Sequence, residues 1–375
     1  MQYLVLQVTP HEELLCNYLE NISDAELSCD YAFTVTRIAN PALISLSGDN
    51  GGSFSFVTSP QKSKIRFALD VRKALKSRDY THIHFHSSWA SLVGLLAIQD
   101  KSGVVKVVHS HSVIPEKGVF TRFRSALARK VFNLIADERL ACSDSAGKQM
   151  FGVNFSILPN VIPYERFHFD GTKRNIIRRE LKISEGAKVI GHVGNFYEAK
   201  NHEFLIEAML PIMKSDPTLI LLLVGGELIG GDAALLDRIR RRVDSERISQ
   251  QVIFAGNVSN PADFYSAMDV FVFPSIYEGF GMALLEAQVS GLPCIHSDTI
   301  PSEAIVSKNS IGLSLNSDSI TWTKSIREAL ETASSESILE ERSELLSDPR
   351  LDSSLHAKGL LRFYERSFTR MKGLV

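Results

Sequence analysis

The stretch Tyr277-Glu278-Gly279-Phe280-Gly281-Met282-Ala283-Leu284-Leu285-Glu286 decides the fold. It follows the apolar run 269–274, which predicts a buried strand, and it leads into a segment that predicts a helix. The two glycines let the backbone approach a ligand closely, and the first turn of the helix offers N–H groups that favour a diphosphate. Glu278 on the loop can accept hydrogen bonds from hydroxyl groups, and the two oxygens of Glu286 suit a diol. An ordinary turn with acids nearby is the plain alternative, but two glutamates around Gly-Phe-Gly make a more specific pattern.

Around this stretch, short apolar runs alternate with longer amphipathic segments, which predicts parallel sheets with crossover helices. Strands are expected at residues 3–8, 82–86, 104–109, 139–142, 189–194, 219–225, 252–255, 270–274 and 293–297. Helices are expected at 64–76, 89–99, 120–136, 201–213, 233–243, 262–267, 282–289 and 354–371. Residues 163–185 are polar and resemble a link, after which the pattern restarts.

The sequence therefore predicts an α/β protein of two doubly wound, Rossmann-like domains that face each other across a cleft. The first domain is expected at 1–168 and the second at 169–353, with the helix 354–371 packing back on the first. Ligands of such sheets bind at the carboxyl ends of the strands beside helix N-termini. The cleft between the two domains is therefore the expected active site.

The 375 residues are enough for two domains, and a composition of 44% hydrophobic and 22% charged residues is that of an ordinary globular protein. The net charge of -2 is unevenly distributed, because residues 61–148 hold 16 Lys and Arg against 7 Asp and Glu. A positive surface there suits phosphates or an anionic membrane, although a solvated basic face gives the same pattern. The four cysteines show neither metal-ligand spacing nor a disulfide framework, and no signal peptide or membrane span is evident. We therefore expect a cytoplasmic protein, either free or peripheral on the inner face of the membrane.

Three further segments accompany the opening stretch. They are Gly191-His192-Val193-Gly194-Asn195-Phe196 followed by Lys200-Asn201-His202, then Val252-Ile253-Phe254-Ala255-Gly256, and Gly291-Leu292-Pro293-Cys294-Ile295. Together they cover most of residues 188–305 and resemble the retaining GT-B glycosyltransferases of the family 4 type, whose Glu-x7-Glu motif binds the donor. The Lys-Asn-His sequence is similar to that of capsule and exopolysaccharide transferases. The resemblance implies transfer of a sugar from a nucleotide-diphosphate sugar, a UDP-sugar first and a GDP-sugar next, to a glycan or polyprenyl-linked acceptor.

The resemblance also implies site residues. Lys200 would neutralise charge on the leaving diphosphate, Glu278 would orient the transferred sugar, and His111 would hydrogen-bond that sugar near its C6 hydroxyl. Implied donor-binding residues are Asn195, Gly256, Asn257, Val258, Gly279, Phe280, Gly281, Met282, Ala283 and Glu286, and His86 and His11 are implied on the acceptor side. Asn201 is a candidate N-cap that would place Lys200 near a helix N-terminus. By position alone, Lys200 also fits a solvated loop lysine.

The chain departs from the family pattern in three places. Asn195 stands where the family usually has an arginine after the strand, so a charge is missing, and Arg178 is a candidate to supply it. Thr9-Pro10-His11-Glu12-Glu13 replaces a glycine-rich loop, and Asn160-Val161 replaces Asn-Gly. These departures keep open a catalytically degenerate subunit that binds a nucleotide sugar or a partner transferase. A sugar-nucleotide epimerase shares the architecture and is a further alternative, whereas a periplasmic sugar-binding protein would need an export signal.

Histidines cluster at His82, His84 and His86 and again at His109 and His111. Strand spacing places the first three on one face, which fits a zinc site. The similar family carries His-x-His there without metal, however, and no Asp-x-Asp occurs that would hold a diphosphate through a divalent ion. We therefore expect no metal and no cofactor, with Lys200 and helix amides supplying the positive charge.

Residues 120–135 combine basic and apolar side chains, with Arg122, Arg124, Arg129 and Lys130 among Phe123, Leu127, Val131 and Phe132. This pattern fits a helix at an anionic membrane surface, and it fits a packed helix with a solvated basic edge equally. A membrane contact would make a polyprenyl-diphosphate-linked glycan the natural acceptor. Because no carboxylate nucleophile is evident, the expected chemistry is a same-face displacement in which the departing phosphate takes the acceptor proton.

Overall fold

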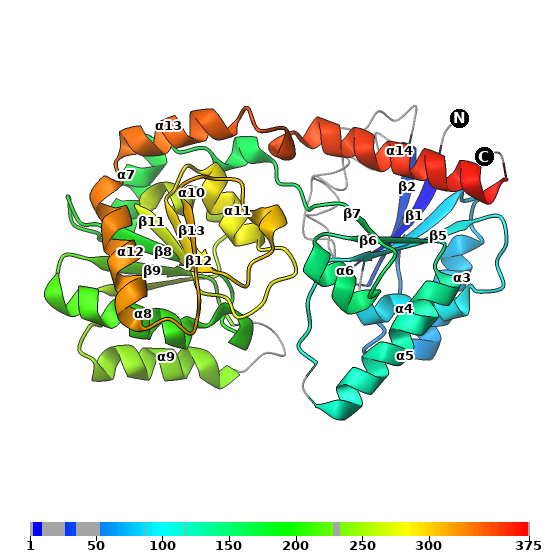
Figure 1. The fold of residues 1–375 in the computed structure, drawn as a ribbon, viewed down its shortest axis with the longest axis horizontal. Helices are drawn as coiled ribbons and strands as arrows, with labels where there is room; N and C mark the ends of the chain where they lie inside the picture. Colours follow the sequence, from blue (N-terminus) through cyan, green and yellow to red (C-terminus); the bar gives the residue numbers. More distant parts are fainter. Residues whose placement is uncertain are drawn as a thin grey trace. The chain divides into compact units, whose positions relative to one another are not determined.

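The computed structural model describes residues 3–9, 27–34, 53–86, 88–116, 118–227 and 233–373 (Figure 1). Its contacts divide the chain into two units. The first comprises Met1–Ile162 and Asp352–Val375, and the second comprises Pro163–Leu351. The chain therefore leaves the first unit six residues before the sequence-based boundary at 168 and returns at Asp352.

In the described part of the first unit, a parallel seven-stranded sheet has the order β3-β2-β1-β4-β5-β6-β7. Its strands are β1 (Tyr3–Thr9), β2 (Leu27–Phe33), β3 (Phe54–Phe56), β4 (His82–Phe85), β5 (Val105–Ser110), β6 (Glu138–Ala141) and β7 (Ser156–Ile157). β1 and β4 pair in parallel, with Val5 opposite His82 and Val8 opposite Phe85. The strand order reverses here, and an open parallel sheet binds its ligands outside the carboxyl ends of strands at such a point.

Helices cover both faces of this sheet. The helices α3 (Lys64–Leu75), α4 (Ser88–Ala97), α5 (Val119–Ile135) and α6 (Asp144–Met150) lie on one face, where residues such as Phe67, Leu95 and Phe132 form a core. The C-terminal helix α14 (Ser353–Met371) lies on the opposite face and buries Tyr364 and Phe368 (Figure 1). The last helix thus belongs to the first unit, although it follows the whole of the second in the sequence.

The described part of the second unit contains a parallel six-stranded sheet in the order β10-β9-β8-β11-β12-β13. Its strands are β8 (Val189–Val193), β9 (Ile220–Val224), β10 (Val252–Gly256), β11 (Val270–Phe273), β12 (Cys294–Ser297) and β13 (Ser310–Leu313). The helices α8 (His202–Ser215), α9 (Ala233–Ser245) and α12 (Ser319–Thr332) pack on one face around a large apolar core. The other elements are α7 (Gly171–Glu180), α10 (Pro261–Ala267), α11 (Met282–Val289), α13 (Ser335–Leu345) and the short turns η1 (Tyr164–Phe167), η2 (Glu198–Lys200), η3 (Ser302–Ala304) and η4 (Pro349–Leu351). The order reverses between β8 and β11, and open parallel sheets bind their ligands at such a point.

The expectation that 163–185 is a simple link was wrong. Residues 171–180 form α7, which packs against α10 within the second unit. Arg174 and Arg178 reach the buried Asp269 with N–O distances of 2.6 and 2.8 Å. The charged stretch is therefore a docked helix, and its polarity comes from an internal ion-pair network.

Candidate functional site

The loop between β11 and α11 carries the residues that dominate the sequence pattern. Gly281 occupies the N-cap position of α11 with φ of 104°, a left-handed conformation that side chains disfavour. A Cβ atom at this position would lie 3.3 Å from Ile300, so the helix start fits closely against its neighbour. Phe280 is buried and fixes the loop beside Gly279. The arrangement aims the first turn of α11, from Met282 and Ala283, toward the carboxyl edge of the sheet.

Lys200 and Glu278 meet at the switch point of this sheet. Their Nζ and Oε1 atoms lie 2.6 Å apart, and their side chains are only 12% and 11% exposed. The ammonium also lies 4.6 Å from the centroid of the Phe273 ring. Gly194, just after β8, makes room for the lysine stem, because a Cβ there would lie 3.2 Å from its Cδ and Cε atoms. The fold thus brings together two predicted residues that are far apart in sequence.

The expected capping role of Asn201 was wrong in its detail. Asn201 does occupy the N-cap position of α8, but its side chain makes no cap hydrogen bond. It adopts the left-handed conformation instead, with φ of 56°, which asparagine tolerates. This reversal of the chain direction ends the η2 turn that holds Lys200.

Glu286 lies on α11 and is held by a tyrosine. The Tyr265 hydroxyl is 2.8 Å from Glu286 Oε2 and 3.1 Å from the carbonyl oxygen of Ala283. Tyr265 is fully buried, and burial together with the neighbouring carboxylate raises its pKa well above the usual value. The phenol therefore keeps its proton and donates it. The sequence alone did not point to Tyr265. Its contact joins α10 to α11, and the spacing of residues within either helix does not show that the two helices meet.

The remaining predicted donor residues lie at the ends of β8 and β10, where they meet the glycines that follow β9. Asn195 Oδ1 accepts a long hydrogen bond, 3.4 Å, from the Gly226 amide, and Gly225 donates to the Gly256 carbonyl at 2.9 Å. A Cβ on Gly226 would lie 2.5 Å from Asn257 Nδ2, so these loops are closely packed. Val258 follows Asn257 in the segment after β10.

Arg178 does not take the place of the arginine that Asn195 replaces. Its guanidinium donates to Asp269 and to the carbonyl oxygens of Ala267 and Ala187. These partners lie where β8 and β11 begin, whereas Asn195 lies where β8 ends. The proposed substitution is therefore wrong, because a parallel sheet separates the two positions by the length of its strands.

In the first unit, His86 follows β4 and His111 follows β5. His86 Nδ1 and His111 Nε2 lie 3.0 Å apart, so the two predicted histidines form a pair. The other ring nitrogens contact amide oxygens, His86 Nε2 with Gln7 Oε1 at 2.7 Å and His111 Nδ1 with Asn160 Oδ1 at 3.1 Å. Gln7 and Asn160 are thus site neighbours that the sequence analysis did not name as such. His11 lies outside the described residues.

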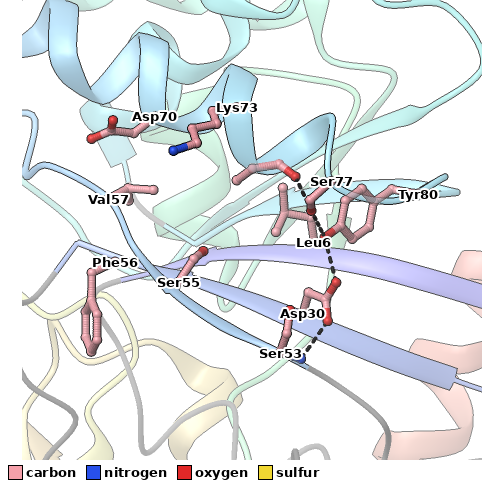
Figure 2. A pocket seen from close by; sticks show the side chains of 11 residues that line it. Leu6, Asp30, Ser53, Ser55, Phe56, Val57, Asp70, Lys73, Ser77 and Tyr80 are labelled. Carbon is pink, nitrogen blue, oxygen red and sulfur yellow. Dashed lines mark hydrogen bonds between the residues drawn. The ribbon is translucent and has the colours of Figure 1, made fainter.

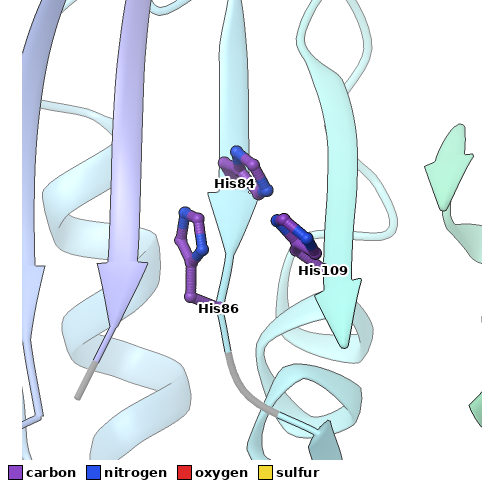
Figure 3. Close-up of side chains that lie close together, drawn as sticks. All are labelled: His84, His86 and His109. Carbon is purple, nitrogen blue, oxygen red and sulfur yellow. The ribbon is translucent and has the colours of Figure 1, made fainter. Parts of the chain in front are cut away.

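Two more histidines share this face of the sheet. His84, His86 and His109 lie close together at β4 and β5, with His86 on the side of β4 that faces β1, and their ligand nitrogens all lie within 4.8 Å of one another (Figure 3). Burial lowers the pKa of His84 and His109 well below the usual value, and the neighbouring histidines lower it further. These imidazoles are therefore neutral, which is the form that binds metal ions.

A pocket of about 310 Å³ lies elsewhere in the first unit, against α3 and the strands β1 to β3 (Figure 2). Its lining includes Asp30, Ser53 and Tyr80, and the Asp30 carboxylate accepts hydrogen bonds from the Tyr80 hydroxyl at 2.6 Å and the Ser53 amide at 2.7 Å. Arg78 completes the ion pair of Asp30. None of the predicted site residues that the structure describes lines this pocket.

Comparisons with known proteins agree with this geometry. Residues 173–345 match the model of glycosyl transferases group 1, and residues 46–166 match that of Glycosyltransferase Family 4. The chain is 30% identical over 290 residues to the putative glycosyltransferase EpsF of Bacillus subtilis, covering 74% of each chain. It is 27% identical over 245 residues to a UDP-Gal:alpha-D-GlcNAc-diphosphoundecaprenol alpha-1,3-galactosyltransferase of Escherichia coli, covering 61% of each. The structure of HepE from Anabaena in complex with UDP superposes with a TM-score of 0.74 at 17% identity, covering 98% of this chain and all of that one.

Proposed function

Since this chain belongs to the group 1 glycosyltransferases and has the GT-B fold, we propose that it transfers a sugar from a UDP-sugar to a glycan or lipid-linked glycan, with retention of anomeric configuration. The product would be a surface polysaccharide or its precursor. The observation that carries this proposal is the Lys200–Glu278 pair at the switch point of the second sheet, beside the N-terminus of α11. One member suits a diphosphate and the other suits sugar hydroxyls.

In the proposed reaction, the Lys200 ammonium acts on the diphosphate and the Glu278 carboxylate acts on the sugar. The Lys200 ammonium moves from Glu278 to the diphosphate and neutralises the charge that grows as the sugar–phosphate bond breaks. The Glu278 carboxylate accepts hydrogen bonds from the sugar, and Glu286, oriented by Tyr265, accepts them from the ribose. The acceptor oxygen bonds to the anomeric carbon on the face that the diphosphate leaves, and the acceptor proton passes to the departing phosphate oxygen. We propose that this donor site needs no metal ion, because Lys200 and the helix amides supply the positive charge.

The donor and acceptor classes rest on the names of similar proteins. The Escherichia coli relative is named for a UDP-sugar donor and a diphosphoundecaprenol-linked acceptor, and HepE was crystallised with UDP. Both support UDP as the nucleotide here. The former supports a lipid-linked acceptor.

A peripheral contact with the membrane fits such an acceptor. Along α5, Phe120, Phe123, Leu127 and Leu134 are 56–84% exposed, and they lie on the side opposite the buried Phe132. Arg122, Arg124 and Lys130 are exposed on the same helix, which carries no acidic residue. An exposed apolar stripe flanked by cations suits an anionic bilayer surface. Among the described residues, no helix has both the length and the apolar character needed to cross a bilayer.

The reaction can be tested with UDP-sugars and lipid-linked acceptors extracted from membranes. The proposal expects release of UDP that depends on the acceptor, and a product whose anomeric configuration, measured by NMR, is that of the donor. An inverted product would contradict the retaining mechanism. Activity with GDP-sugars alone would contradict the proposed donor.

A further inference from the structure

Two aromatic rings lie against Lys200, the cation on which the proposed reaction depends. Its Nζ atom lies over the Phe273 ring, 4.6 Å from the centroid, and over the Tyr197 ring, 5.9 Å from the centroid. Both distances are within the roughly 6 Å at which the face of an aromatic ring attracts a cation. The ammonium also contacts the carboxylate of Glu278, whose Oε1 atom lies 2.6 Å away.

Backbone hydrogen bonds hold the lysine in place beside the two rings. Tyr197 precedes the η2 turn, and the Lys200 amide donates to the Tyr197 carbonyl at 3.0 Å, which closes the turn. Phe273 is the last residue of β11 and is completely buried. The Ile276 amide donates to the Ala199 carbonyl at 2.7 Å, which ties the segment after β11 to the η2 turn. The position of the ammonium therefore depends on the backbone as well as on the ion pair.

The rings around the lysine are uncharged. Burial lowers the pKa of His192 to about 4 and that of His202 to about 2, and the Lys200 ammonium contributes to both shifts. Burial raises the pKa of Tyr197, and the Glu278 carboxylate raises it further, so the phenol keeps its proton. At pH 7 these three rings therefore neither repel the ammonium nor cancel its charge.

A ring and a carboxylate act on the ammonium in different ways. The carboxylate cancels its charge, whereas a ring attracts it through the quadrupole of its π-system and adds no net charge. In the proposed reaction Glu278 accepts hydrogen bonds from the sugar, so the ammonium gives up this partner while the diphosphate is in place. The rings remain in contact with Lys200 and leave its full positive charge for the leaving group.

We propose that Phe273 and Tyr197 form an aromatic clamp that holds the Lys200 ammonium in position for the diphosphate. The clamp acts when Glu278 binds the sugar and releases the lysine, so this inference rests on the proposed function. Phe273 and Tyr197 are positioning residues, because they act through Lys200 and not on the substrate. Phe273 contributes more, because its ring is closer to the ammonium and fully buried.

Fluorination of the Phe273 ring tests the clamp with little change in the shape of the side chain. Phe273 is replaced, in the full chain, by mono-, di- and trifluorinated phenylalanine, and UDP release is measured with UDP-sugars and lipid-linked acceptors. Each fluorine withdraws electron density from the ring face and weakens its attraction for a cation. The value of kcat should fall stepwise, by about tenfold for the trifluorinated ring, while the KM for the acceptor stays unchanged. In a Lys200→Met chain the same replacements should have no effect.

The matched control is Phe271, which lies on the same strand and is also fully buried. Its ring stacks with that of the neutral His192, with 6.3 Å between the centroids. Fluorination of Phe271 should therefore leave kcat unchanged. Tyr197→Phe keeps the second ring of the clamp and should keep kcat within about twofold, whereas Tyr197→Leu should lower it about threefold.

Equal rates across the fluorinated series at Phe273 would overturn the clamp. A similar fall at Phe271, or a fall that persists in the Lys200→Met chain, would also overturn it, because the effect would then not act through the ammonium. In each of these cases, a low activity of Lys200→Met itself would leave the proposed function standing.

NMR of the free chain, labelled at its lysines, tests the clamp without any need for activity. The Lys200 signals are identified by their absence in Lys200→Met. The two ring faces should shift the Hε resonances of Lys200 upfield, and Phe273→Leu should reverse most of this shift. Resonances at the ordinary lysine position in the wild type would overturn the clamp even if no sugar transfer is found.

Discussion

At the scale of single residues, the proposed chemistry depends on the pair formed by Lys200 and Glu278. Lys200→Met should lower kcat by about 10²- to 10³-fold, because nothing then neutralises the leaving diphosphate. It should also lower the unfolding midpoint, because the buried Glu278 carboxylate loses its counter-charge, so rates are compared at a temperature where the variant is folded. Initial rates of UDP release measure this effect. Lys214→Met is the control, because Lys214 is exposed and pairs with Glu246. A Lys200→Met enzyme as active as the Lys214→Met enzyme would contradict the role given to Lys200.

We expect Tyr265 to support UDP binding by holding the Glu286 carboxylate in place. Tyr265→Phe removes the hydroxyl that holds the carboxylate, at a cost of about one hydrogen bond, so the Kd for UDP should rise about three- to tenfold. Calorimetric titration of UDP measures this change. Tyr80→Phe in the first unit also removes a hydroxyl beside a buried carboxylate, that of Asp30, and it should leave the Kd unchanged. Equal weakening in both variants would show a general loss of stability rather than a positioning role.

The helix α7 depends, at the scale of elements, on one buried aspartate. Asp269 accepts from Arg174, Arg178 and the Val189 amide, so Asp269→Asn leaves two partly buried guanidinium groups without their counter-charge. The free energy of unfolding should fall by about 3 kcal/mol, measured by urea denaturation. Glu207→Gln breaks the exposed pair with Arg242 and should cost less than about 1 kcal/mol. Similar losses in the two variants would mean that the ion-pair network does not dock α7.

The apolar stripe of α5 makes a second prediction at this scale. Phe123→Ser combined with Leu127→Ser should reduce binding to phosphatidylglycerol vesicles by at least about tenfold, because each side chain contributes roughly 1.5–3 kcal/mol when buried in the acyl region. Vesicle co-sedimentation at low salt measures this binding. Ile320→Ser with Leu339→Ser removes exposed apolar side chains of the second unit and should have no effect. Unchanged binding in the α5 variant would refute the membrane contact.

Stability of the whole molecule should fall in mild acid. Burial lowers the pKa of His192 to about 4 and that of His202 to about 2, so both stay neutral in the folded chain where the unfolded chain binds protons. The unfolded state holds more protons below its pKa of about 6.5, and the free energy of unfolding therefore decreases as the pH falls from there toward 4. Each histidine should cost about 2 kcal/mol at pH 5. Urea denaturation at pH 7 and pH 5 measures the difference, and equal stability at the two values would show that these histidines become protonated in place.

The sequence revealed what is local and missed what depends on distant partners. Glu278 and Glu286 could be predicted because one strand, one loop and one helix turn place them. α7 was taken for a link because its arginines find Asp269 about 90 residues away, and nothing nearby in the sequence shows that partner. Tyr265 was missed for the same reason.

In the first unit, β2 and the directions of the histidine ring nitrogens also depend on partners that are distant in the sequence. β2 was missed because Ser28 and Asp30 interrupt its apolar run, and the partners of the Asp30 carboxylate, among them Ser53, Arg78 and Tyr80, come from later segments of the chain. The histidine spacing was visible in the sequence, but the directions of the ring nitrogens depend on Gln7 and Tyr364, which come from opposite ends of the chain.

The most direct test of the central claim is a thermal-shift titration with UDP in the presence of EDTA, for the wild type and for Glu286→Ala. A working donor site without metal predicts an unfolding midpoint that rises with UDP concentration in the wild type. The rise should be lost in Glu286→Ala and should exceed the rise with GDP. A wild-type midpoint that no nucleotide shifts would contradict a functional donor site in the second unit.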